Sequence, residues 1–311
     1  MVNETVFQNI VNVKKCIKYC QGSDTFNDEL EDLPLCVTAD GILRAFKHER
    51  PIYWSRYNSM VPESNHRFIH NDLYPLLTPS VSMHCLVCFD LQAFASVLPN
   101  TLAASKYKTQ ETVVPWNAEN LNIPNKNWLE NVWTYIDSVT VPSHLTAPPK
   151  PDESEKLLSP LLAWCLVPCR QSDSTKHEGH RFDVLFPVCK AKFVLDLQSF
   201  KGPIETALER LALPCLDENF ISQPKSLLHT LVVSVENPQA LLCYLHEYKN
   251  IIKTRTIRSK DCLAILEFIA QNLEEILEGT NEDDLLNMIK EVPLHVTISG
   301  QKLTWIQLLK F

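Results

Sequence analysis

Glycine is scarce in this sequence, and the spacing of its glycines excludes two classes of nucleotide site. Six glycines occur among 311 residues, at positions 22, 41, 179, 202, 279 and 300. Walker loops and dinucleotide-binding loops need clustered glycines, because their backbone N–H groups must approach a phosphate closely. No two glycines lie within six residues of each other here. Both kinds of loop are therefore excluded.

The sequence also lacks a basic excess and long apolar runs. Its 29 Lys and Arg face 37 Asp and Glu, a net charge of -8 that disfavours non-specific binding to nucleic acid or anionic membrane. No apolar run approaches the ~20 residues of a membrane span, and the N-terminus has no signal-peptide pattern. The 11 cysteines are scattered through apolar segments, as buried thiols in a reducing cytosol would be. We therefore expect a cytoplasmic protein without nucleic-acid binding or membrane insertion.

Cysteine pairs in the sequence resemble metal or redox sites only superficially. Cys85 and Cys88 form a Cys-x-x-Cys pair, but a zinc site needs a second pair of ligands and a redox site needs a βαβ context. The apolar residues around them favour core packing, in which cysteine acts as a small hydrophobic residue. The same interpretation applies to the pairs Cys16/Cys20 and Cys165/Cys169.

The remaining catalytic patterns are absent or poorly matched. The segment His177-Glu178-Gly179-His180 spaces its histidines by three, whereas the zincin pattern needs a spacing of four on one helical face. No Gly-x-Ser-x-Gly nucleophile elbow occurs. We therefore assign no catalytic, cofactor-binding or metal-binding residue and expect a protein that is not an enzyme.

One segment is repeated near the two ends of the chain. Residues 33–46 (LPLCVTADGILRAF) read as two apolar strands joined by Asp40-Gly41, a pair favoured in type I′ turns. Residues 292–300 (VPLHVTISG) repeat the apolar-Pro-Leu-x-Val-Thr-x-x-Gly pattern 259 positions later. The sequence thus predicts strand hairpins at 33–46 and 292–309.

The periodicity of the rest of the chain predicts an α+β fold. Apolar residues at helical spacing favour helices over 5–20 and 126–139, and helices dominate 203–290. Apolar runs favour strands in 82–89 and 162–197. The Pro-rich polar segment 141–155 reads as a linker between an N-terminal α+β lobe, 1–145, and a C-terminal α+β lobe, 156–311. It reads equally well as a long surface loop within one continuous domain.

A basic cluster and an acidic one follow each other late in the sequence. Lys249, Lys253, Arg255, Arg258 and Lys260 precede the acidic run of residues 274–284. A nucleic-acid site would need interleaved aromatic residues and a wider basic field. Solvated helix faces of opposite sign explain the pattern best, and the alternative is a docking surface for neighbouring modules.

The two hairpin segments resemble a known family. Residues 33–46 are similar to the recurring LPL..T.DG.LR.F element of the sacsin family, giant cytoplasmic co-chaperones built of large internal repeats. Residues 292–300 resemble the related LPL..T..G element of those repeats. The resemblance implies a fragment from within one repeat, outside the Hsp90-like nucleotide-binding segments, whose signatures are absent. No functional residue carries over, because the matched positions are turn and strand residues.

The resemblance implies a role in protein quality control. We expect a non-catalytic structural or interaction module, whose partners are neighbouring repeats of the same chain. For the full-length protein, the resemblance implies client proteins, Hsp70-type chaperone machinery and proteasome-linked quality control. One alternative is a cytosolic thiol-dependent enzyme that uses one of the 11 cysteines, and another is residual nucleotide binding.

Overall fold

The computed structural model divides the chain into two compact units, residues 1–101 and 102–311. The boundary that we predicted between 145 and 156 lies inside the second unit. The structure describes the following residues: 4–20, 33–45, 51–55, 68–77, 86–140, 151–172, 181–217, 220, 227–255, 257–277, 282–296 and 302–303.

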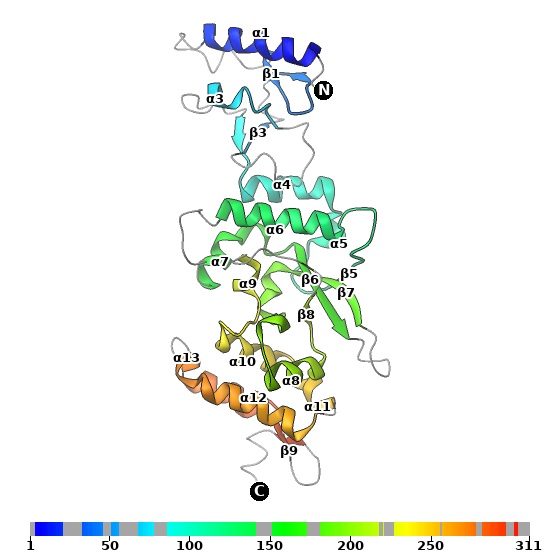
Figure 1. Ribbon diagram of the computed structural model, residues 1–311, viewed down its shortest axis with the longest axis vertical. Helices are drawn as coiled ribbons and strands as arrows, with labels where there is room; N and C mark the ends of the chain where they lie inside the picture. The colour runs from blue at the N-terminus through cyan, green and yellow to red at the C-terminus, as the bar shows by residue number, and fades with distance from the viewer. Residues whose placement is uncertain are drawn as a thin grey trace. The chain divides into compact units, whose positions relative to one another are not determined.

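In the first unit, an amphipathic helix packs on a small sheet (Figure 1). Helix α1 (Glu4–Cys20) confirms the helix predicted over 5–20. Its residues Ile10, Val13 and Ile17 are spaced by three and four, so they share one face of the helix. That face packs in a core with Cys36, Val37, Ile52, Ile69 and Leu73.

The strands of the first unit are short. Strand β1 (Cys36–Val37) pairs with β2 (Leu43–Arg44) antiparallel, and β3 (Ile52–Trp54) pairs with β4 (Leu86–Cys88) parallel. Bridges from residues 68 and 69 to Tyr53 and Thr38 connect the two pairs into one irregular sheet. The described part of the unit also contains the short helix α3 (Tyr74–Leu77) and helix α4 (Leu91–Thr101).

The first hairpin forms, but its turn differs from the prediction. The Thr38 N–H donates to the Ile42 carbonyl, which leaves three residues, 39–41, in the connection. Gly41 has φ of 81°, whereas Asp40 has a negative φ. A type I′ turn needs positive φ at both central residues, so this prediction is wrong. A three-residue connection with glycine in the left-handed region is the observed solution.

The second unit contains a four-stranded sheet in the order β5-β7-β6-β8. The strands are β5 (Val114–Pro115), β6 (Cys165–Ser172), β7 (Arg181–Pro187) and β8 (Cys215–Leu216), and all their pairings are antiparallel. Strands β6 and β7 confirm that strands lie within 162–197. Consecutive residues Pro168 and Cys169, in the regular part of β6, are both buried, which means that both faces of this central strand are covered.

Helices cover this sheet. Helix α6 (Lys126–Thr140) confirms the predicted amphipathic helix, and the indole N–H of Trp133 donates to the Leu166 carbonyl of β6 at 2.8 Å. The short helix α5 (Ala104–Tyr107) precedes β5. Part of the segment that we read as a linker is helical, because α7 spans Pro151–Leu157 and starts at a proline, which a first helical turn tolerates.

The C-terminal part of the second unit is a helical layer. Its helices are α8 (Pro203–Leu211), α10 (Pro238–Glu247), α11 (Lys249–Thr254), α12 (Ser259–Gln271), α13 (Leu273–Leu277) and α14 (Glu282–Glu291). Helix α9 (Leu227–Leu231) instead contacts α6 and α7. Three 3₁₀ helices, η2 (Ser159–Leu161), η3 (Val188–Phe193) and η4 (Leu197–Ser199), lie in the described connections before it. The layer confirms that helices dominate 203–290.

The repeated segment forms a second hairpin directly after α14. Strand β9 (His295–Val296) pairs antiparallel with β10 (Lys302–Leu303). The pairs Leu303↔His295 and Lys302↔Val296 match Arg44↔Cys36 and Leu43↔Val37 with a constant offset of 259 positions. The two hairpins therefore share not only a sequence pattern but also the register in which their strands pair. Residues 304–309 of the predicted hairpin lie outside the described residues. Small sheets together with segregated helices confirm the α+β class.

Candidate functional site

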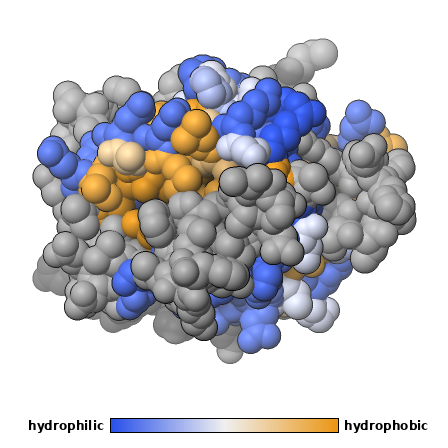
Figure 2. All heavy atoms as spheres, turned by 90° about the horizontal axis from the view of Figure 1, so that it is seen from below, coloured by the Kyte–Doolittle hydropathy of each residue, from blue (hydrophilic) through white to orange (hydrophobic). Residues whose placement is uncertain are grey.

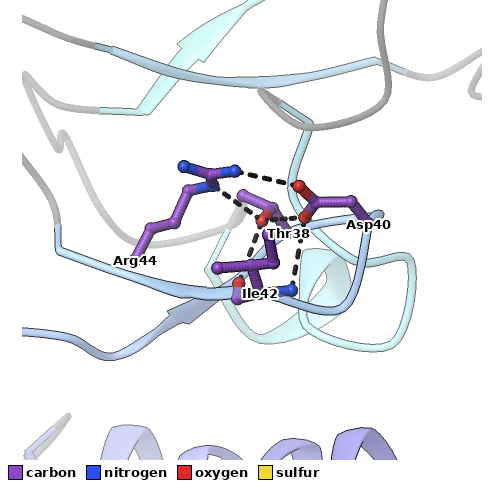
Figure 3. Close-up of polar contacts among 4 residues, drawn as sticks. All are labelled: Thr38, Asp40, Ile42 and Arg44. Atoms are coloured by element: carbon purple, nitrogen blue, oxygen red, sulfur yellow. Dashed lines mark hydrogen bonds and ion pairs between the residues drawn. The ribbon is translucent and has the colours of Figure 1, made fainter. Parts of the chain in front are cut away.

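A network of hydrogen bonds closes the turn of the first hairpin (Figure 3). The Thr38 hydroxyl lies 2.5 Å from Asp40 Oδ1 and 2.9 Å from the Ile42 carbonyl, and its single proton is shared between these acceptors. The Ile42 N–H donates to Asp40 Oδ1 at 3.3 Å. Arg44 donates from Nε to Thr38 Oγ1 at 3.2 Å and from Nη2 to Asp40 Oδ2 at 2.9 Å. Four residues of the repeated segment therefore pair their hydrogen-bonding groups with one another.

The electrostatics of Asp40 follow from this network. Partial burial favours its neutral form, but the hydrogen bonds from Thr38, Arg44 and Ile42 and the Arg44 charge outweigh burial, so the pKa of Asp40 is lowered. Both carboxylate oxygens are engaged by donors of the same hairpin. The arrangement supports a turn-stabilising role for Asp40, as the sequence predicted.

Burial makes the interior thiols poor nucleophiles. It raises the pKa of Cys36 and of Cys165 to about 12. It also raises the pKa of Cys169, Cys189 and Cys243 above their ordinary value. The thiolate is the nucleophilic form of cysteine. These five thiols are therefore predominantly protonated at neutral pH.

The cysteine pairs of the sequence are only partly core residues. Cys165 and Cys169 are buried on β6, as we predicted. Cys16 and Cys88 are exposed, so the core interpretation is wrong for them. Cys16 precedes the inward-facing Ile17 on α1, and β4 has a described strand partner on one side only. Cys85, the side chain of Cys20 and the segment 177–180 lie outside what the structure describes.

Within the described residues, no group of three His, Cys, Asp or Glu side chains is placed to hold a metal ion. Among the same residues, no helix combines the length and hydrophobicity needed to cross a membrane. Within the basic cluster, Lys253, Arg258 and Lys260 are solvent-exposed, as predicted for a solvated face, whereas Lys249 and Arg255 are half-buried.

The fold assembles charge pairs that the sequence did not reveal. Arg170 on β6 places its Nε 3.3 Å from Asp217 Oδ1 and 3.6 Å from Asp183 Oδ1. Burial and the nearby Asp217 charge raise the pKa of Asp183. In the helical layer, Arg210 Nη1 of α8 donates to Asp261 Oδ1 of α12 at 2.7 Å, and the Asp261 side chain is only 5% exposed. These pairs tie neighbouring elements together.

Two histidines also form cross-element contacts. His229 of α9 places Nδ1 3.1 Å from Asp196 Oδ2. His246 of α10 places Nε2 2.9 Å from Glu291 Oε2, and Lys249 Nζ contacts both side chains. The hydrogen bonds from Lys249 and His246 lower the pKa of Glu291. The acidic partners of the two histidines lie 33 or more positions away in sequence, a separation that local patterns do not report.

Apolar side chains are exposed on an ordered loop between β5 and α6. Leu121 is 96% exposed and Ile123 is 46% exposed. The indole N–H of Trp116 donates to the Pro124 carbonyl at 2.9 Å, which closes the loop around these two residues. The Asn125 side chain accepts from the backbone N–H of Trp128 at the start of α6. The loop therefore presents two exposed apolar side chains on a backbone that internal hydrogen bonds hold in place.

A second apolar area lies at the end of the helical layer. Viewed from below, hydrophobic residues gather beside hydrophilic ones (Figure 2), at the end where Figure 1 draws α12 and α13. Leu263 of α12 and Leu273 of α13 are large apolar residues of these helices that remain exposed. This area is a further candidate for contact with another protein.

Comparison with known proteins gives one relevant similarity. The chain is 28% identical to human sacsin over 320 residues, which cover 93% of the chain and 6% of sacsin. The chain thus spans a small part of the length of this relative. No family model matches the chain, and no solved structure matches it. The alignment confirms the resemblance that the two hairpins indicated.

Proposed function

We propose that this chain is a non-catalytic structural and protein-interaction module of a large sacsin-like co-chaperone. The similarity to human sacsin along 93% of the chain is the observation that carries the proposal. The engaged carboxylate of Asp40 and the raised pKa values of the buried thiols support a role other than catalysis. On this proposal, the module acts in the cytoplasm in protein quality control.

The exposed apolar residues support an interaction role. Leu121 and Ile123 lie on a loop whose backbone is fixed by internal hydrogen bonds. A pre-organised apolar contact loses little conformational entropy on binding. The proposed partners are neighbouring repeats of the same protein and, for the whole co-chaperone, unfolded clients and the Hsp70-type machinery.

The proposal is tested by suppression of aggregation. The chain is added without nucleotide to citrate synthase as a probe client, at a temperature at which the client aggregates and the chain stays folded, and light scattering is recorded. We expect the chain to lower the scattering. Leu121→Asp with Ile123→Asp should reduce this effect, because charges on the loop oppose apolar contact.

A matched control separates the loop from general surface effects. Tyr19→Asp changes an apolar residue of α1 that is 89% exposed, and it should behave like the unmodified chain. Scattering that the unmodified chain leaves unchanged would contradict the client-binding part of the proposal. Equal loss of activity in the loop variant and in Tyr19→Asp would contradict the assignment to the loop.

A further inference from the structure

The two hairpins share one sequence pattern and one register, but they differ in burial. At the start of the second hairpin, Val292 is 1% exposed and Leu294 is 3% exposed. At the matching position of the first hairpin, Leu33 is 44% exposed. Pro293 is buried, whereas the matching Pro34 is exposed. Leu35, which matches Leu294, is half-buried and packs against the core of the first unit. The first two residues of the apolar-Pro-Leu segment are therefore covered in the second hairpin and open in the first.

The helical layer covers the second hairpin. Val292 and Leu294 belong to one core with Leu208 of α8 and with Ile265 and Ile269 of α12. Strand β9 contacts α12 directly. The Val292 N–H donates to the Met288 carbonyl at the end of α14, which fixes the entry of the chain into the hairpin. The apolar-Pro-Leu segment thus serves as a docking element for an aliphatic helical surface.

The first hairpin has a covered side and an open side. Cys36 and Val37 are buried in the core with α1. The segment Leu33-Pro34-Leu35 precedes β1, and Ile42 and Leu43 on the return strand are also exposed. The positions of the second hairpin that match Ile42 and Leu43 carry Gln301 and Lys302. The first hairpin therefore keeps apolar residues where the second has polar ones, as expected if a further surface covers it.

We propose that the Leu33-Pro34-Leu35 segment docks on a helical layer of the α8–α12 kind that a neighbouring repeat supplies. The occupant is identified by the second hairpin, which binds such a layer with the same segment in the same register. The inference rests on the proposed function as a module between repeats. The neighbouring layer has to be free of a covering hairpin of its own, which excludes a second copy of this chain, because its α8–α12 layer already carries Val292 and Leu294.

The test weakens the second hairpin and offers the first one in its place. The variant Val292→Ala with Leu294→Ala reduces the apolar contact with the helical layer in the full chain. A synthetic peptide of residues 33–46, with Cys36→Ser to prevent disulfide exchange, is added in excess. We expect the peptide to raise the Tm of the variant by several degrees, because a ligand that binds only the folded state stabilises it.

The same peptide with Leu33→Asp and Leu35→Asp is the matched control and should leave the Tm unchanged. Equal shifts with both peptides, or none with either, would overturn the proposal.

A graft keeps the test decisive if the alanine variant fails to fold. In the full chain, Val292→Leu with His295→Cys converts residues 292–296 into the sequence of residues 33–37. We expect this graft to keep the Tm of the unmodified chain, while a Tm as low as that of the single variant Leu294→Ala would overturn the proposal. The outcome is independent of the aggregation assay, so failure of either proposal is recognised separately.

Sedimentation of the unmodified chain tests whether the helical layer comes from a neighbouring repeat or from a second copy of this chain. We expect a monomer over the accessible concentration range, because the chain's own layer is occupied. A concentration-dependent dimer that Leu33→Asp abolishes would assign the surface to self-association and would overturn the neighbouring-repeat assignment.

Discussion

Alkylation of the native thiols discriminates between the interaction module and the thiol-dependent enzyme. The perturbation is iodoacetamide at pH 7, with mass spectrometry following each cysteine separately. A catalytic cysteine needs a lowered pKa, because only its thiolate attacks. Burial instead raises the pKa of Cys36 and Cys165 to about 12.

The expected rate follows from these pKa values. At pH 7, a thiol with a pKa of about 12 is ionised to about one part in 100,000, and one at the ordinary value of 9.0 to about one part in 100. The thiolate population of Cys36 and Cys165 is therefore about 1,000-fold smaller than that of an unperturbed thiol. Their burial slows the reagent further. A thiolate of higher pKa is also more nucleophilic, with a Brønsted coefficient of about 0.4–0.5, so we expect both residues to be labelled at least roughly 30-fold more slowly than a free thiol.

Internal references make the labelling result interpretable. Cys16 is exposed on α1 and reports the reactivity of an accessible thiol in the same sample. Unfolding in guanidinium should equalise the rates of all cysteines, because the cause of the difference is the fold. Labelling of native Cys36, Cys165 or Cys169 at or above the rate of Cys16 would refute the reasoning and favour the thiol-dependent enzyme.

Further outcomes follow from the charge pairs and the buried thiols. Arg210→Met should lower the free energy of unfolding, measured in urea, by about 3 kcal/mol, because it leaves the buried Asp261 carboxylate without its partner. Adding Asp261→Leu should recover part of this loss, and a double variant that is less stable than the single one would contradict the reasoning. Asp40→Ala should cost about 1 kcal/mol and speed hydrogen exchange at Ile42, since the turn loses its partly exposed pair with Arg44; unchanged exchange argues against the network. Burial raises the pKa of the Cys36 and Cys165 thiols, so their contribution to the free energy of unfolding is complete below pH 9 and is lost as the pH rises toward about 12. The loss is ~1.4 kcal/mol for each thiol and each pH unit. A Tm that does not change between about pH 9 and 11, the range between the ordinary and the raised thiol pKa, would contradict this expectation.

The sequence predicted those helices and hairpins whose pattern lies within a short stretch of residues. The apolar spacing of Ile10, Val13 and Ile17 defines one helical face whatever the rest of the fold does. The repeated apolar-Pro-Leu segment predicted two hairpins, and both occur. The turn type was wrong because Asp40-Gly41 is compatible with more than one connection length, and the Thr38–Ile42 pairing selects a three-residue one.

Tertiary contacts decided the features that the sequence did not predict. Proline at position 151 suggested a linker, yet proline also suits the first turn of a helix, and α7 starts there. The division after residue 101 follows no Pro-rich segment. The pair Arg210 and Asp261 joins residues 51 positions apart, and one sequence contains no signal for such a contact. For the same reason, the exposure of Cys88 could not be inferred from its apolar neighbours.

The two hairpins achieve order by different means, and this difference bears on function. Val292 and Leu294 anchor the second hairpin in the helical core, and its positions matching Asp40 and Arg44 are Ser299 and Leu303, which cannot form an ion pair. The first hairpin leaves Leu33 exposed and instead closes its turn with the Thr38, Asp40 and Arg44 network. A local network fixes the hairpin before any partner arrives, which lowers the entropic cost of docking. The polar turn and the exposed apolar segment are therefore parts of one pre-organised contact surface.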